Sequence, residues 1–446
     1  MFLRKISAVA AALTMVFTGA ATTATARQSE DVHSDNVQQL ARVPIKIAAK
    51  NVAEGSDLAF RGNLLVAGTY QGVGFFRILE DAPYLKQISF FNCPASQGDV
   101  SIRGDLVFVS INTGGGSNTG RSNVCNNTDN SQEKAGVRVV DISDLRQPRQ
   151  VAFVETDCGS HTHTLMPDGD MNYLYIQSYP LGAQTPTCSV VSHRKVSIVA
   201  VPSSAPEKAK VANTLDVSPQ IGCHDVSVFP SKDIAGAACI GESQIWDIKN
   251  PAQPEIIARI YNPFIGIHHS AALTWDAKKL VLGDEFAGSV TGACAGSQQS
   301  PIGAMWFYDI TDPTSPQLEG YYNTPRDGHP GSAEEATYMA CTTHNLGILP
   351  MKNPSKYIAT VPYRAAGLSI VDFSDPANPE EIGFYHQLTG GIPDIWSAYW
   401  YQGRIYTNDN GTARGVSVYE MKGLDASAVR FFRGDMNPQT QIPNFR

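Results

Sequence analysis

The stretch GVRVVDISDLRQPRQVAFV, residues 136–154, decides the fold of this chain. It starts with a strand that ends hydrophobic-Asp-hydrophobic, passes through a turn containing Pro, and continues in a second strand. The same arrangement returns in SQIWDIKNPAQPEIIARIY (243–261), AMWFYDITDPTSPQLEGYY (304–322) and GLSIVDFSDPANPEEIGFY (367–385). Weaker copies begin at residues 72, 195 and 415, which makes seven copies of one diverged repeat.

Two further strands lie between successive copies, and the first of them has a signature of its own. In chain order it reads DLAFRG, DVSIRG, HTLMPDG, DVSVFPS, SAALTWD, NLGILP and SAYWYQG. Each repeat thus offers four strands. Four-stranded units that recur every roughly 40 to 75 residues are typical of propeller blades. The sequence therefore predicts an all-β fold, a seven-bladed β-propeller with four-stranded antiparallel blades. A generic antiparallel sheet is the alternative.

The ends of the chain are expected to flank the ring. Residues 42–51 (RVPIKIAAKN) resemble a fourth strand for the last blade, so an N-terminal strand would close the ring and leave no open sheet edge. We expect a signal peptide over 1–26, a flexible segment over 27–41, the propeller over 42–423 and a C-terminal tail over 424–446. The tail is expected to be either an extra edge strand or a loose end.

The first 26 residues have the layout of a secretory signal peptide. A basic start (Arg4, Lys5) precedes an apolar run over 6–20, and small residues end the segment at Ala26. The apolar run is shorter than the roughly 20 residues that a membrane span needs. We therefore expect export, to the periplasm or as a secreted protein, without membrane insertion.

The net charge of the chain limits the kinds of molecule that it can bind. The formal net charge is −8, and the sequence contains no basic cluster that could neutralise several phosphates. We therefore expect no nucleic-acid partner. The expected substrate is a small molecule or an oligosaccharide.

Several repeat units resemble the LVIVD-repeat family of exported bacterial β-propellers. They are VVDISD (139–144), WDIKNP (246–251), YDITDP (308–313) and VDFSDP (371–376). The resemblance extends over most of residues 42–421 and implies a propeller fold and export, but no single chemistry. Three copies depart from the pattern, because Arg77, Ala200 and Glu420 stand where Asp is usual.

Histidine recurs at one position of the repeat. When the first-strand signatures are aligned on their turns, the position six residues before the turn is occupied by Ser56, Gly98, His161, His224, His269, His344 and Ser397. Four successive blades therefore carry histidine there, out of ten histidines in the chain. Because innermost strands line the channel of a propeller, these positions form a ring around its axis.

Imidazoles that converge from separate rigid strands favour a transition metal. Neutral imidazole is a common ligand of Fe, Cu and Zn, whereas Ca²⁺ and Mg²⁺ prefer oxygen ligands. The predicted ligands are His161, His224, His269 and His344, with His163 and His268 as alternates. Two other interpretations stay open, a metal-free pocket that uses the histidines as acid and base, and a structural ladder.

Other chemistry-bearing side chains are expected on the same face of the ring, where second strands end. Glu285 is the strongest candidate for a general base or a partner of the imidazoles, and Glu242, Tyr363 and Arg364 are further candidates. Solvated rim charges are the alternative for each of them. Arg326 and Arg364 are the cations expected near the site.

Eight cysteines indicate an oxidising compartment. From their places in the predicted blades, we expect the disulfides Cys93–Cys125, Cys158–Cys188, Cys223–Cys239 and Cys294–Cys341. They would fix the rim of the histidine face. Long loops over 112–135, 178–194 and 287–303 are expected to form a wall or lid there.

These observations lead to three functional hypotheses. The first is a metal-dependent enzyme, an oxidoreductase acting on a small organic substrate, because four nitrogen ligands leave coordination positions open. Metal-dependent oxidoreductases with four-histidine propeller sites are similar in layout, by analogy only. The second is a lyase or hydrolase acting on a polysaccharide or other secreted substrate, although the acidic charge disfavours a polyanion. The third is a non-catalytic binding propeller.

Overall fold

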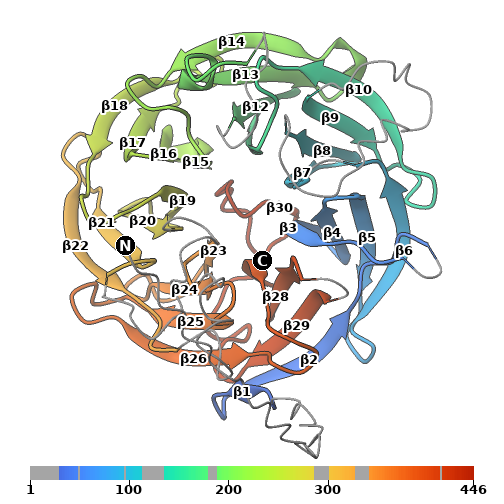
Figure 1. Cartoon of the computed structure of the whole chain (residues 1–446), viewed down its shortest axis with the longest axis vertical. Helices are drawn as coiled ribbons and strands as arrows, with labels where there is room; N and C mark the ends of the chain where they lie inside the picture. The colour runs from blue at the N-terminus through green and yellow to red at the C-terminus, as the bar shows by residue number, and fades with distance from the viewer. Residues whose placement is uncertain are drawn as a thin grey trace, which may run out of the picture.

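The computed structural model describes residues 30–48, 51–94, 97–112, 135–178, 188–285, 301–326, 341–411 and 414–446. Within this part the protein is all-β. Helix is limited to the 3-10 turns η1 (Ser192–Arg194), η2 (Pro206–Lys208) and η3 (Pro230–Lys232). Figure 1 shows the sheets arranged around a common centre, with the chain passing from sheet to sheet around the ring. No helix in the described part is long and apolar enough to cross a membrane.

Most sheets consist of four consecutive antiparallel strands, with the first strand innermost (Figure 1). The first sheet contains β3 (Gly55–Arg61), β4 (Leu64–Thr69), β5 (Gly72–Ile78) and β6 (Leu85–Asn92), with the short β30 (Asp435–Met436) beside β3. The second contains β7 (Val100–Arg103), β8 (Leu106–Ile111), β9 (Gly136–Asp141) and β10 (Arg149–Glu155). The third contains β11 (Thr162–Asp168), β12 (Met171–Gln177), β13 (Lys195–Pro202) and β14 (Lys210–Asp216).

The later sheets continue this order. The fourth contains β15 (Asp225–Phe229), β16 (Ile234–Cys239), β17 (Glu242–Asp247) and β18 (Glu255–Ile260). The fifth contains β19 (His268–Leu273), β20 (Lys279–Asp284), β21 (Met305–Asp309) and β22 (Gln317–Tyr322). The last sheet has nine strands, β23 (Asn345–Ile348), β24 (Ile358–Pro362), β25 (Leu368–Asp372), β26 (Glu380–His386), β27 (Ile395–Tyr401), β28 (Arg404–Asp409) and β29 (Gly415–Met421), with β1 (Val32–His33) and β2 (Val37–Val43) at its two edges. Its two halves are joined by a parallel pairing of the inner strands β23 and β27.

The repeat Asp has a local structural role. At the end of the third strand its Oδ1 accepts a hydrogen bond from the backbone N–H two residues later, at 2.8 to 2.9 Å. The four pairs are Asp141–Ser143, Asp247–Lys249, Asp309–Thr311 and Asp372–Ser374. This Asx turn leads the chain toward the fourth strand, so the motif that marks the repeat in the sequence is a turn signal.

The apolar core lies between adjacent sheets. Ala59, Val66 and Phe75 of the first sheet belong to one cluster with Val107 and Val109 of the second. Comparable clusters fill the other interfaces. Close packing between sheets fixes the inner strands, and therefore the polar residues at their starts.

The N-terminal strand lies earlier in the sequence than predicted. β2 (Val37–Val43) pairs antiparallel with β29 as the outermost strand of its sheet. Only the last two residues of β2 belong to the predicted strand 42–51, and β2 begins inside the segment 27–41, for which flexibility is expected. Pro44 accounts for the difference, because it has no N–H to donate and the ladder ends before it.

The C-terminal tail enters the centre of the ring, and its short strand β30 is an extra edge strand on the inner side of the first sheet. β30 pairs with the inner strand β3, and Figure 1 places the C-terminus near the centre. The Asn437 side chain exchanges two hydrogen bonds with the backbone of Ile102 (2.7 and 2.9 Å). The backbone of Gln439 and Gln441 makes two more with Val228 (2.8 Å each). The tail thus pairs with backbone N–H and C=O groups on the edges of the inner strands that face the axis. These backbone groups would otherwise lack partners.

Two predicted disulfides, Cys158–Cys188 and Cys223–Cys239, are confirmed. Cys93 and Cys341 are also disulfide-bonded. Their predicted partners, Cys125 and Cys294, lie outside the described residues, as do most of the three predicted lid loops. Disulfides are typical of exported proteins.

Candidate metal centre

Four histidines from four consecutive parts of the ring meet near its axis. His161, His224 and His344 immediately precede the inner strands β11, β15 and β23, and His269 is the second residue of β19. The backbone N–H groups of the first three donate to carbonyls on or at the end of the second strand of their own sheets, at 2.7 to 3.0 Å. Each imidazole is therefore attached to a paired strand and not to a free loop.

The four buried rings form a chain of contacts in which each ring touches the next. Nε2 of His161 lies 2.9 Å from Nε2 of His224. The ring centroids of His224 and His269 are 3.6 Å apart, and those of His269 and His344 are 4.3 Å apart. None of the four residues is more than 3% exposed.

Burial keeps these imidazoles neutral. It lowers the pKa of His161 to about 4. Burial, followed by the neighbouring imidazoles, lowers the pKa of His224 and His344 well below the usual value, and burial also lowers that of His269. A neutral imidazole keeps one unprotonated nitrogen, which is the form that binds a metal.

Several ring nitrogens lack hydrogen-bond partners. Among the described residues, neither nitrogen of His269 nor Nε2 of His344 makes a hydrogen bond, although these atoms are buried. Nδ1 of His344 donates to the backbone carbonyl of Trp396 (2.7 Å), which leaves the lone pair on Nε2. A buried polar atom without a partner costs about 1 to 3 kcal/mol. A bound metal ion would satisfy these nitrogens.

Glu285 follows β20 and lies against two of the histidines. Its Oε2 is 3.2 Å from Nε2 of His269, and its Oε1 is 3.7 Å from Nε2 of His344. Arg364 donates a hydrogen bond to Oε1 (2.7 Å). Burial raises the pKa of Glu285, and the charge of Arg364 opposes this shift. The carboxylate can orient the two imidazoles or bind a metal beside them.

Arg364 is held by a second carboxylate, Asp394, that sequence analysis did not identify. Its Nε and Nη2 donate to the two oxygens of Asp394 (2.7 and 2.8 Å), and its guanidinium carbon lies 5.3 Å from the ring centroid of Trp396. The φ angle of Arg364 is 42°, in the left-handed region that non-glycine residues rarely adopt. The one sequence signal for Asp394 is its place in the connection that leads to the last inner strand.

Three predicted residues lie away from the four-histidine cluster. Glu242 is the first residue of β17, because the chain turns at 240–241, and its carboxylate pairs with Arg259. Tyr363 is buried in the core, and its hydroxyl donates to the backbone carbonyl of Tyr322 (3.1 Å). Nδ1 of His268 contacts a serine hydroxyl of β17 (2.8 Å). Glu242 and Tyr363 thus use their polar groups in contacts within or between sheets, whereas Nε2 of His268 makes no hydrogen bond with a described residue.

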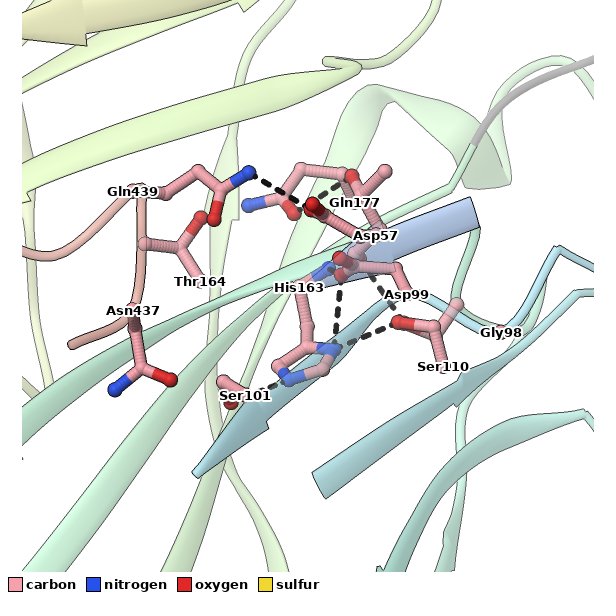
Figure 2. Close-up of polar contacts among 12 residues, drawn as sticks. Asp57, Gly98, Asp99, Ser101, Ser110, His163, Thr164, Gln177, Asn437 and Gln439 are labelled. Carbon is pink, nitrogen blue, oxygen red and sulfur yellow. Dashed lines mark hydrogen bonds and ion pairs between the residues drawn. The ribbon is translucent and has the colours of Figure 1, made fainter. Parts of the chain in front are cut away.

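His163 also points away from the cluster, into contacts between the second and third sheets (Figure 2). Its Nε2 lies 2.7 Å from Oγ of Ser101, and its Nδ1 lies 2.7 Å from Oγ of Ser110 and 3.1 Å from Oδ2 of Asp99. Ser101, His163 and Asp99 have the contacts of a Ser–His–Asp triad. Ser101 is buried within β7, however, and both ring nitrogens already have protein partners. We interpret His163 as a bridge between sheets.

The fold and the buried histidine cluster define a β-propeller with a candidate metal centre near its axis. A family model described as LVIVD repeat matches residues 308–324 and 357–387, so the chain carries LVIVD repeats, and the resemblance noted in the sequence is confirmed. Among solved structures, the periplasmic gluconolactonase PpgL of Pseudomonas aeruginosa is similar, with a TM-score of 0.50, 10% sequence identity, and coverage of 74% of this chain and 84% of that chain. At this identity the similarity shows the fold alone. No curated protein matches the sequence.

Proposed function

We propose that this protein is an exported metal-dependent enzyme whose transition metal, Fe, Cu or Zn, is held by His161, His224, His269 and His344. The observation that carries the proposal is the contact of four buried, neutral imidazoles, with three ring nitrogens that have no hydrogen-bond partner among the described residues. The ligand atoms of His269, Glu285 and His344 also lie within 4.8 Å of one another, as a metal site requires. Imidazole nitrogen suits these three metals.

An oxidoreductase acting on a small organic substrate is the reaction class that this ligand set favours. Four nitrogen ligands on Fe or Cu leave positions where oxygen or a substrate can bind. Glu285 lies 3.2 Å from His269 and is held by Arg364, so it can orient that imidazole or accept a proton from a bound substrate.

We further infer that the ring is a seven-bladed propeller closed by β2. The division of the nine-stranded sheet at the parallel pair β23–β27, and the pairing of β2 with β29, support this inference. Export to the periplasm or the medium, after removal of residues 1–26, belongs to the same proposal. The disulfides Cys158–Cys188 and Cys223–Cys239 support it.

A hydrolase or lyase is the second candidate. The observation in its favour is the fold similarity to a protein that is itself a gluconolactonase. Zn at the imidazoles would polarise a carbonyl group or activate water. A polyanionic polysaccharide is disfavoured as the substrate, because Arg326 and Arg364 already pair with carboxylates of the protein.

Elemental analysis tests the metal centre. Protein is purified from its own export compartment, without chelator or nickel affinity, and the metal is quantified per chain. We expect about one Fe, Cu or Zn per chain, lost in His224→Ala because removal of one ligand weakens the site. His386→Ala is the matched control and should keep the metal. His386 is buried, burial lowers its pKa to about 4, and its Nε2 contacts the backbone carbonyl of Ala365 (2.9 Å) outside the cluster.

The outcomes separate the candidate functions. Fe or Cu supports the oxidoreductase, and Zn supports the hydrolase or lyase. Folded wild-type protein without any of the three metals would rule out the metal centre. The metal-free acid–base pocket and the binding propeller would then be the surviving hypotheses.

A further inference from the structure

A pocket of about 590 Å³ lies beside the last sheet, at the opposite ends of the strands from the histidines. It is formed by the turn after β23, the ends of β25 and β29, and the first residues of the C-terminal tail. His344 immediately precedes β23, whereas the pocket residue Met351 lies beyond the end of that strand. Pockets that bind small molecules have about this size. The pocket is therefore separate from the candidate metal centre.

The floor of the pocket is apolar. Five side chains form it, Met351, Ile358, Ile382, Met421 and Leu424. Ile358 and Leu424 belong to the buried core, and the other three are partly exposed and pack against it. The pocket thus exposes one edge of the core. Its two methionines can adapt to the shape of an apolar ligand, and a hydrocarbon chain that covers this surface removes it from water.

Three lysines stand around this floor, Lys352, Lys356 and Lys422. Nζ of Lys356 donates to the carboxylate of Asp372 (2.6 Å), so this charge is paired. Nζ of Lys352 donates to the backbone carbonyl of Ala426 (2.5 Å), which does not neutralise its charge. Lys422 forms no ion pair or side-chain hydrogen bond with a described residue. The rim of the pocket therefore carries two uncompensated positive charges, although the net charge of the chain is −8.

The nearest carboxylates do not compensate these two charges. Asp372 is paired with the third lysine. Asp425, in the tail, accepts hydrogen bonds from the backbone N–H and the hydroxyl of Ser427. Across the described residues, neither carboxylate forms an ion pair with Lys352 or Lys422. An anionic ligand would supply the missing negative charge.

We propose that this pocket binds an amphiphilic carboxylate of the fatty-acid type. Its hydrocarbon chain would cover the apolar floor, and its carboxylate would lie between Lys352 and Lys422. An apolar floor alone accepts any hydrophobic molecule, and lysines alone accept any anion, so the combination selects a ligand that has both parts. The methylene groups of the lysines extend the apolar surface, while their ammonium groups stay at the rim.

Calorimetric titration with decanoate tests this site in full-length, chelator-treated protein. The chelator is needed because a metal at the histidines would also bind a carboxylate. We expect saturable binding of about one decanoate per chain. Butyrate has the same charge and a shorter chain, and decanol has the chain without the charge. Each should bind at least about tenfold more weakly, because buried methylene groups and the charge both contribute to affinity.

The double variant Lys352→Gln/Lys422→Gln should weaken decanoate binding by about tenfold or more, because it removes both uncompensated charges. Both side chains are exposed, so the change leaves the core intact. The matched control is Lys232→Gln/Lys249→Gln, which replaces two exposed lysines after the first and third strands of the fourth sheet. This control should bind decanoate as the wild type does. His269→Ala should do so too, which separates the pocket from the proposed metal centre.

Three results would overturn the proposal. The first is wild-type protein without saturable binding of decanoate. The second is equal affinity for decanoate and decanol, since the pocket would then not recognise an anion. The third is a Lys352→Gln/Lys422→Gln protein, with the Tm of the wild type, that binds decanoate as tightly as the control variant.

Discussion

Arg364 connects the histidine cluster with the last part of the ring. It pairs with Glu285 on one side and with Asp394 on the other, at 2.7 Å each, and its side chain is 9% exposed. Its removal would leave the largely buried carboxylate of Glu285, which is 12% exposed, without its cation. Glu285 would also lose the contact that holds it against His269.

Arg364→Gln is expected to lower the free energy of unfolding by about 3 to 5 kcal/mol and to weaken metal retention. The control is Arg149→Gln, which breaks an ion pair with Asp141 at a side chain that is 70% exposed. That change should stay within about 1 kcal/mol. Urea denaturation measures the first quantity, and titration with a chelator measures the second. Equal effects of the two substitutions would contradict the role given to Arg364.

Sequence analysis can find functional residues that share a repeat position, and misses those that do not. The four histidines could be aligned because each stands at the same place before an inner strand. Asp394 has no counterpart at a shared repeat position, because it lies in the irregular connection before β27. The backbone carbonyl of Trp396, at the start of β27, carries no side-chain signal in the sequence. The sequence predicts Glu242 at the end of the second strand of its repeat. The short turn at 240–241 instead puts it at the start of the third strand, β17.

At the scale of elements, β2 pairs with β29, a strand from the other end of the chain. It is the outermost strand beside β29. The repeat could indicate that a fourth strand was missing from the last copy. It could not give the register, because β2 lacks the repeat motif and Pro44 ends it early.

A cross-strand disulfide tests this pairing. Gln38 of β2 lies opposite Glu420 of β29, and both are exposed. Opposed residues of antiparallel strands have Cα atoms about 4.5 to 5.5 Å apart, within disulfide range. Gln38→Cys/Glu420→Cys should therefore form a bridge and stabilise the protein by about 2 to 4 kcal/mol, seen as a higher Tm than that of wild type without reductant. The single variant Gln38→Cys is the control, and a folded double variant with two free thiols would contradict the pairing.

At the scale of the whole molecule, the C-terminal tail occupies the axis that the inner strands surround. The sequence left open an extra edge strand or a loose end; β30 is such an edge strand, but the tail carries no copy of the repeat that could have placed it at the axis. Near the axis, however, the inner strands offer backbone groups that have no neighbouring strand, and polar side chains satisfy them. Thr440, for example, is 4% exposed and donates to the backbone carbonyl of Leu165 (2.7 Å).

Removal of residues 437–446 should therefore affect the inner strands before the outer ones. Hydrogen exchange is expected to lose protection at Ile102 and Val228, whose N–H groups donate to the tail, while the outer strands β10 and β18 keep theirs as an internal control. The free energy of unfolding should fall by roughly 5 kcal/mol, since the hydrogen bonds of the tail to Ile102, Leu165 and Val228 number five and each contributes about 1 kcal/mol net. Unchanged protection at the two inner positions would contradict the docking of the tail. A loss that is equal in inner and outer strands would instead mean that the tail stabilises the ring as one cooperative unit, because no sheet could then open alone.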